Sequence, residues 1–257
     1  MNKKRTLDKQ NNSGTALVHG LSHDGRGIAS IQNITTFIAG SLPKETVAYT
    51  IKHQTNRYHE AEATCIFNPS PERVLPACPH FGICGGCSLQ HMSSDAQIHL
   101  KERTLLEQLQ HFGRVIPEQV LNPLHADSYH YRRKARLGVK YVIKKNKVLV
   151  GFREKSSRYL ADMTQCSILH KGISDHLLHL SQLIASLSIY QHIPQIEIAV
   201  GDVDIALVFR HLAPLSQEDI NKFIHFGQQF HFHIYLHRLR ITHLDKVPVS
   251  LKVPKFG

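Results

Sequence analysis

The chain has 257 residues, of which 42% are hydrophobic and 20% are charged, a composition that excludes an intrinsically disordered protein. It contains no apolar run of about eighteen residues, which excludes a transmembrane helix, and Met1-Asn2-Lys3-Lys4-Arg5 leads into polar residues without the apolar core of an export signal. The formal net charge of +11 favours a polyanionic partner, and we expect a cytoplasmic monomer that does not associate with membranes.

The first quarter of the chain has the pattern of a small β-barrel. Residues 1–13 are polar and basic, so we expect them to form a disordered arm. Turn signals then separate five short apolar or alternating runs, at residues 16–18, 27–31, 36–38, 46–51 and 61–67. Five short strands within residues 14–68 predict a closed barrel of the oligonucleotide-binding kind. Cys65 falls in the last run, where we expect it to be buried.

Prolines at positions 69, 71 and 76 mark a boundary, and residues 69–257 then alternate helices with strands. This alternation predicts a mixed α/β domain, so the chain as a whole is expected to be an α+β protein. A first helix is expected to have Ser94 as its N-cap and to end at Gly113, with an apolar face formed by Ile98, Leu105, Leu109 and Phe112. The later elements are expected to be a hairpin at 132–152, a helix at 173–188, a hairpin at 196–209, a helix from Ser216, and strands at 231–236 and 248–253.

Three cysteines lie within ten residues at the start of this second region. Cys78, Cys84 and Cys87 form a C-x5-C-x2-C loop, and Cys166 lies much further along the chain. Three clustered thiolates and one distant thiolate can form a four-sulfur site that tertiary folding closes, as an iron–sulfur cluster requires. Three glycines would let the loop bend tightly and bring amide N–H groups toward the sulfurs: Gly82, Gly85 and Gly86.

Two other interpretations of this cysteine cluster stay open. His91 extends the pattern to C-x5-C-x2-C-x3-H, which is close to that of a zinc knuckle. The cluster can also be incidental. Disulfides are disfavoured, because in a reducing cytosol clustered cysteines are more often metal ligands or catalytic groups.

A cationic strand is the second informative feature. Within residues 129–141 a period of two separates one face, with Tyr131, Arg133, Ala135, Leu137, Val139 and Tyr141, from a second face with Arg132, Lys134, Arg136 and Lys140. Residues on one face of a strand recur about every 6.6–7 Å, which is close to the phosphate spacing of extended RNA. We therefore expect the cationic face to contact RNA phosphates, with tyrosines as stacking surface. The alternative is a solvated edge strand whose charges prevent aggregation.

The sequence shows no catalytic machinery beside these two features. It has no Gly-rich nucleotide loop after a strand, no Walker motif and no G-x-S-x-G motif. Its 20 histidines are scattered and form no H-E-x-x-H pattern. The sequence therefore predicts a metal site and a nucleic-acid-binding surface, but no catalytic site.

The order of the motifs over residues 14–257 resembles the N-terminal half of bacterial 23S rRNA (uracil-5-)-methyltransferases. The motifs in question are His23-Asp24-Gly25-Arg26-Gly27-Ile28-Ala29, Leu42-Pro43-Lys44-Glu45, the C-x5-C-x2-C loop, Tyr131-Arg132-Arg133-Lys134-Ala135-Arg136, Gly151-Phe152-Arg153 and Cys166. The resemblance implies an RNA-binding TRAM barrel and 23S rRNA as partner. It also implies a central domain that holds a [4Fe–4S] cluster on Cys78, Cys84, Cys87 and Cys166.

The resemblance further implies an enzyme that uses S-adenosylmethionine, bound in a C-terminal Rossmann-like domain. That domain, its cysteine nucleophile and its glutamate base have no matching positions here, so the chain is expected to supply no catalytic residue and to be inactive alone. The competing hypothesis is a stand-alone, non-catalytic RNA-binding module with a zinc or iron–sulfur site. A fragment of a radical S-adenosylmethionine enzyme is disfavoured, because the C-x3-C-x2-C spacing is absent.

Overall fold

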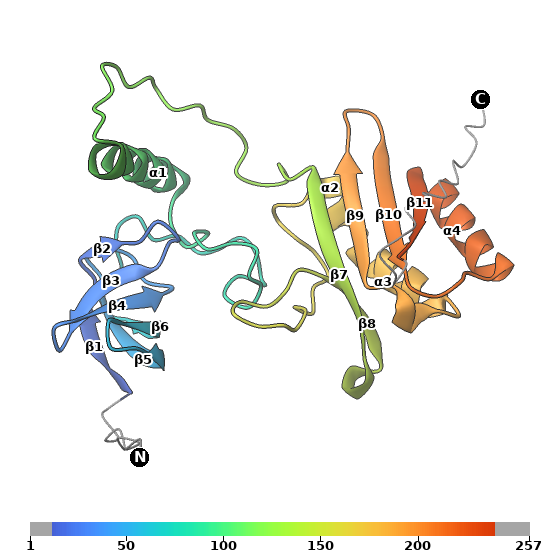
Figure 1. Cartoon of the computed structure of the whole chain (residues 1–257), viewed down its shortest axis with the longest axis horizontal. Helices are drawn as coiled ribbons and strands as arrows, with labels where there is room; N and C mark the ends of the chain where they lie inside the picture. The colour runs from blue at the N-terminus through green and yellow to red at the C-terminus, as the bar shows by residue number, and fades with distance from the viewer. Residues whose placement is uncertain (1–11, 240–257) are drawn as a thin grey trace, which may run out of the picture. The chain divides into compact units, whose positions relative to one another are not determined.

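The computed structural model describes residues 12–239, so most of the predicted basic arm and the predicted strand at 248–253 lie outside the described residues. The chain divides into two compact units, each built from two stretches of sequence. The barrel unit contains residues 12–77 and 87–125, and the sheet unit contains residues 78–86 and 126–239 (Figure 1). The two units mix helices and strands, which confirms the predicted α+β class.

The barrel unit has all five predicted strands and one additional short strand. Its sheet contains β1 (Ser13–Leu17), β2 (Gly20–Leu21), β3 (Gly27–Ile31), β4 (Ile34–Ala39), β5 (Thr46–Gln54) and β6 (Tyr58–Ile66). The hydrogen-bonded order is β1-β5-β6-β4-β3-β2, in which only β4 and β6 are parallel. Among the described strands, β1 and β2 are the two edge strands of this sheet and do not pair with each other. The predicted closed barrel is therefore a curved half-barrel. The two-residue β2 is too short to carry a further ladder.

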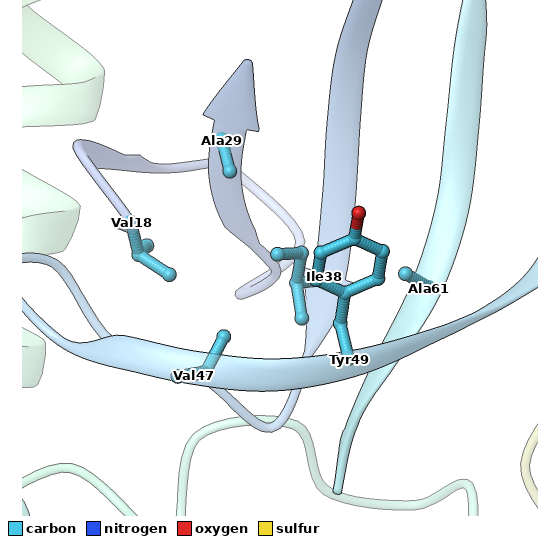
Figure 2. Close-up of a cluster of buried hydrophobic side chains, with 6 residues drawn as sticks. All are labelled: Val18, Ala29, Ile38, Val47, Tyr49 and Ala61. Atoms are coloured by element: carbon cyan, nitrogen blue, oxygen red, sulfur yellow. The ribbon is translucent and has the colours of Figure 1, made fainter. Parts of the chain in front are cut away.

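The half-barrel encloses a small core of alternating inward residues. Figure 2 shows this core, whose members come from four strands, β3 to β6, and from the residue directly after β1: Val18, Ala29, Ile38, Val47, Tyr49 and Ala61. Inward and outward positions alternate along β3 and β4, as a sheet with one solvated face requires. The period of two in the sequence therefore predicted this part of the fold.

The prediction that Cys65 is buried is wrong. Ala48 pairs with Cys65 while Tyr49 pairs with Ala63, so β6 carries a bulge at Thr64. An extra residue shifts the inward–outward alternation by one position. Cys65 therefore lies on the solvated face of β6 and is exposed.

A buried carboxylate ties the segment after β6 to the half-barrel. The Glu45 side chain is fully buried and accepts hydrogen bonds from Leu42 N at 2.7 Å and Ser70 N at 3.0 Å. Arg73 Nε lies 2.6 Å from the same carboxylate. Burial would raise the pKa of Glu45, but these donors and the Arg73 charge hold the pKa below its ordinary value.

The first helix of the barrel unit begins one residue earlier than predicted. It is α1 (Ser94–Gln108), with the N-cap at Ser93, whose hydroxyl accepts a hydrogen bond from Ala96 N. A π-helical turn (Leu109–Gly113) follows, and Arg114 ends it in the left-handed conformation. The buried residues of α1 are Ala96 and Leu100, which pack with Leu42 and Met92. The predicted apolar face is therefore not the buried one, since Leu105 and Phe112 are exposed.

The sheet unit is a five-stranded sheet with helices on one face. Its elements are β7 (Lys134–Val142), β8 (Lys147–Gly151), α2 (Lys171–Ser174), α3 (Leu177–Ser186), β9 (Gln195–Val200), β10 (Ile205–His211), α4 (Gln217–Phe230) and β11 (Phe232–Arg238), with 3-10 turns at Ile143–Lys145 and Tyr190–His192. The strand order is β11-β10-β9-β7-β8, with only β10 and β11 parallel. These elements match the prediction, except that the helix predicted at residues 173–188 is divided into α2 and α3.

The register of the sheet assigns residues to its two faces. Leu137, Ile196 and Phe209 lie opposite one another on β7, β9 and β10, and all three are fully buried. Phe209 packs on Phe223 of α4 with ring centroids 4.7 Å apart, so this is the helix-covered face. Neighbouring positions, such as Arg136, point to the opposite face.

The alternative that the cationic strand is an edge strand is wrong, because β7 pairs with β8 on one side and β9 on the other. No helix within residues 12–239 is both long enough and apolar enough to span a membrane.

Candidate functional site

Backbone hydrogen bonds fix the cysteine loop to the segment that follows β8. Cys84 N donates to His80 O at 2.9 Å, and Gly82 adopts a φ of +87°, which a residue with a side chain rarely adopts. Gly85 N donates to Arg153 O at 2.9 Å, and Lys155 N donates to Ile83 O at 2.8 Å. A Cβ atom at Gly85 would lie 3.3 Å from Arg153 O, so this close approach of two backbones favours glycine.

Cys166 reaches the same region from a different stretch of the chain. Its N–H donates to the Ser174 hydroxyl at 3.0 Å, in a buried setting. Two residues further on, Ile168 O accepts a hydrogen bond of 2.8 Å from Arg132 N, so the chain after Cys166 runs beside the residues that lead into β7. The fold therefore brings Cys166 and the entry to the cationic strand together.

Three of the four predicted ligands are buried. Cys78, Cys84 and Cys166 are buried, and none of the five cysteines is in a disulfide. Burial raises the pKa of Cys84, and the charges of Cys166 and Cys78 raise it further, against a hydrogen bond of 3.4 Å from Gly86 N to its sulfur. Burial and Cys78 likewise raise the pKa of Cys166, which the N–H groups of Leu169 and Ile168 oppose.

Thiols and nearby backbone amides are the groups that a metal–sulfur centre would use. A bound cation would stabilise the thiolate form, so that a coordinating thiol releases its proton to solvent, and amide N–H groups directed at sulfur are the usual outer contacts of such centres. The fourth predicted ligand, Cys87, is half-buried and opens the second stretch of the barrel unit, which also contains the buried His91. Within residues 12–239, no three His, Cys, Asp or Glu side chains stand where they could hold a metal ion.

The predicted cationic row is present on β7. Lys134, Arg136 and Lys140 are exposed, while Ala135, Leu137 and Val139 between them are buried, which confirms the predicted alternation along β7. Arg136 Nε lies 3.7 Å from Glu197 Oε1, a carboxylate that Arg210 approaches to 2.8 Å. In the described part of the chain neither lysine has an ion-pair partner, so both charges are available to a ligand.

The residues just before β7 depart from the predicted pattern. Arg133 was expected on the inward face, but it is exposed, donates to Gly201 O at 2.6 Å and lies 3.5 Å from Asp202. Arg132 is half-buried, and its Nε donates to Lys134 O at 3.2 Å. The strand begins only at Lys134, so a period of two does not apply to these two arginines.

Arg132 instead belongs to a cationic hollow beside the cysteine loop. Its guanidinium lies 5.0 Å from the centroid of the Phe152 ring, a cation–π contact. The hollow has a volume of about 740 Å³ and is lined by Gly85, Gly86 and the segment Phe152–Arg158 in addition to Arg132. Four cations face it against one carboxylate, Glu154: they are Arg132, Arg153, Lys155 and Arg158.

Sequence reasoning missed three of these four cations. Arg153, Lys155 and Arg158 lie in the loop after the predicted hairpin, and each is exposed. The signal available in the sequence was a basic run with two serines, Arg153-Glu154-Lys155-Ser156-Ser157-Arg158, placed between the hairpin and Cys166. It did not follow from the sequence that this run would fold back onto the cysteine loop.

The curated proteins most similar to this chain that we compared share one name. The chain is 50% identical over 222 residues to the 23S rRNA (uracil(1939)-C(5))-methyltransferase RlmD of Nitrosococcus oceani, a match that covers 86% of this chain and 50% of that protein. The proteins of the same name from Francisella tularensis subsp. novicida and Legionella pneumophila are 48% and 44% identical, over 86% and 87% of this chain and 50% and 51% of theirs. The chain thus spans about half the length of the curated relatives it matches. No family model matches it.

A solved structure has a similar fold. The crystal structure of the Pyrococcus abyssi tRNA (uracil-54, C5)-methyltransferase in complex with S-adenosyl-L-homocysteine superposes with a TM-score of 0.60 and 19% sequence identity. The match covers 93% of this chain and 54% of that chain. At this level of identity the likeness concerns the fold.

Proposed function

We propose that this chain is the RNA-recognition half of an S-adenosylmethionine-dependent 23S rRNA uracil-C5 methyltransferase, acting in the cytoplasm as a monomer. The observation that carries the proposal is the set of cations on the sheet unit: an exposed row on β7, and a hollow lined by Arg132, which lies two residues before that strand begins. The relatives of about 50% identity, named for this reaction, supply the chemical context. The methyl group would come from S-adenosylmethionine, and the cysteine nucleophile from outside this chain.

The cationic surface suits a single-stranded or looped RNA. Lys134 and Arg136 would contact successive phosphates, because side chains two apart on one strand face are spaced like phosphates of an extended backbone, and Lys140, four residues beyond Arg136, would contact the second phosphate further on. Arg132, stacked on Phe152, offers a flat cation on which an unstacked base can lie. A uracil that is to be methylated must leave its stack, so a surface that holds its neighbours unstacked would favour the reaction.

We further propose that Cys78, Cys84, Cys87 and Cys166 hold a [4Fe–4S] cluster, and that residues 14–68 are a TRAM-like RNA-binding domain. Support for the cluster comes from three buried, mutually interacting thiols and from the Gly86 N–H directed at Cys84. Binding would require the thiols to lose their protons and turn toward a common centre. The cluster would then link the cysteine loop, through Cys166, to the segment that leads into the cationic strand.

The proposal is tested by RNA binding of the full chain. A 23S rRNA fragment containing the uracil that gives the relatives their name should bind more tightly than a tRNA of similar length, with an affinity that falls as salt rises. Equal affinity for the two RNAs at every salt concentration would contradict the proposal. Metal and sulfide analysis after anaerobic purification should find about four irons and about four sulfides per chain, whereas zinc without sulfide would support the stand-alone zinc module.

A further inference from the structure

A cavity of the sheet unit lies where the β7–β8 hairpin packs against α3. Its volume is about 460 Å³, within the range of about 300–1,000 Å³ that is usual for small-ligand sites. One wall is α3, which contributes Ser181 and Gln182. The opposite wall is the hairpin together with the 3-10 turn before β9, and it contributes Tyr141, Asn146 and Tyr190. None of these residues belongs to the cationic row or to the hollow, so the proposed function gives the cavity no role.

Two tyrosines form an aromatic corner in this cavity. The ring centroids of Tyr141 and Tyr190 are 4.9 Å apart, and the ring planes meet at 81°. The Tyr141 hydroxyl donates a hydrogen bond of 2.7 Å to Asn146 Oδ1, and the Tyr190 hydroxyl accepts one of 3.0 Å from Gln191 Nε2. These bonds hold both rings in place, and both rings are half-buried. A planar ligand can stack on one ring and meet the other edge to face, so the corner suits an aromatic base.

Two carboxamides in the cavity have unused hydrogen-bonding groups. Among residues 12–239, the Gln182 side chain has no hydrogen-bond partner, and neither has the Nδ2 group of Asn146. A carboxamide presents a donor beside an acceptor. This pair matches the N7 acceptor and the N6 amino donor of adenine, whereas guanine presents two acceptors at the same edge. The carboxamides therefore favour adenine over the other purine.

The turn of the hairpin gives the cavity a positive rim. Lys147 lines the cavity, and its ammonium lies 2.7 Å from Asp162. Lys145 shares this carboxylate at 2.9 Å, so two cations face one anion. Lys144 adds a further positive charge on the same turn. A phosphate group attached to the base would be attracted to this rim.

We propose that the cavity binds an adenosine 5′-monophosphate unit. The base lies on the tyrosine corner with its N6 and N7 atoms toward Gln182, and the phosphate lies toward the lysines of the turn. Such a unit occurs both as the free nucleotide, AMP, and within an unpaired stretch of RNA. The assignment rests on the cavity alone and is independent of the proposed function.

The test is equilibrium dialysis of the full chain against labelled AMP and, separately, labelled GMP. The two nucleotides share the sugar, the phosphate and the purine ring system, so a difference in affinity reports on the edge of the base. AMP should bind about fivefold or more tightly than GMP, as expected for an amide that contacts both atoms of the adenine edge. Equal affinities, or no saturable binding of AMP, would overturn the proposal.

Two variants separate recognition of the edge from stacking. Gln182→Met keeps the length of an exposed side chain and removes its hydrogen-bonding groups, so it should abolish the preference for AMP over GMP. Tyr190→Leu should weaken both nucleotides alike, by about fivefold or more, because it removes a stacking surface. The control is Gln228→Met, on an exposed position of α4 outside the cavity, which should keep the preference. A preference for AMP that survives Gln182→Met would overturn the proposal.

A short single-stranded oligoadenylate identifies the source of the unit. If RNA supplies it, the oligoadenylate should displace labelled AMP from the unaltered chain but lose this ability in Gln182→Met. If the ligand is the free nucleotide, the oligoadenylate should leave AMP bound. Both results support the adenosine monophosphate site. Displacement that is unchanged in Gln182→Met would overturn it, because AMP would then be bound by the cations on β7 or in the hollow.

Discussion

Replacing Lys134 and Lys140 with glutamine should weaken RNA binding and flatten its salt dependence. Both side chains are exposed on β7, and within the described residues neither is paired with a carboxylate. Each should therefore neutralise about one phosphate and release its counterion. Arg136 should contribute less, because it shares Glu197 with another arginine.

The magnitude follows from counterion release. For single-stranded nucleic acid each phosphate contact adds about −0.7 to the slope of log K against log salt. The double variant should therefore lose about 1.4 from the slope, and near 0.15 M salt it should bind roughly tenfold to fifteenfold more weakly. Fluorescence anisotropy of a labelled 23S rRNA fragment over several KCl concentrations measures both quantities.

The matched control is Lys222→Gln. Lys222 lies on α4, the helix-covered side of the same sheet, and its ammonium is 2.8 Å from Glu218. Its replacement should leave the affinity and the slope unchanged. A double variant with the slope of the unaltered chain, or a control that loses as much per charge as the β7 lysines, would refute the assignment of the RNA surface to this face.

Three further predictions concern the cysteine site and the half-barrel. Cys166→Ser should abolish iron binding in anaerobically purified protein while Cys65→Ser, on an exposed strand position, keeps it; unchanged iron in the first variant would remove Cys166 from the ligand set. Glu45→Gln should lower the free energy of unfolding by about 3 kcal/mol, because it leaves Arg73 without its buried partner, and Glu62→Gln in an exposed ion pair should cost at most about 1 kcal/mol in the same urea titration. Because the pKa of Glu45 is lowered in the folded chain, its contribution should be complete above the ordinary value near 4.5 and decline as pH falls below it; pH-independent stability through that window in the native chain would contradict the assignment.

The sequence predicted the positions of helices and strands more accurately than it predicted which of their faces are buried. Periods of two and turn signals located the strands of the half-barrel and the β7–β8 hairpin within a few residues. The buried side of α1 was not predictable in this way. Leu105 of α1 and Phe112 of the π-helical turn are exposed to solvent, while the small Ala96 packs inward. A helical period marks an apolar face but not what covers it.

Two errors at single residues have local causes. Cys65 turned outward because a bulge at Thr64 shifted the alternation, and a bulge leaves no mark in an otherwise regular strand sequence. Arg133 was predicted to point inward but is exposed, because β7 begins one residue later, at Lys134. The cationic hollow depended on long-range contacts between the cysteine loop and the segment after β8, which no local pattern encodes.

The interleaved order of the two units has a consequence for synthesis on the ribosome. Cys78 and Cys84 belong to the sheet unit, but a whole stretch of the barrel unit, which begins at Cys87, separates them from the rest of the sheet unit. About 80 residues lie between Cys84 and Cys166, so at 5–20 residues per second the loop emerges roughly 4–16 s before its distant partner. During that interval the thiols cannot be shielded by the fold that later buries them. The proposed cluster could therefore be assembled only after Cys166 has been synthesised, and the unshielded thiols of the nascent chain would be open to oxidation until then.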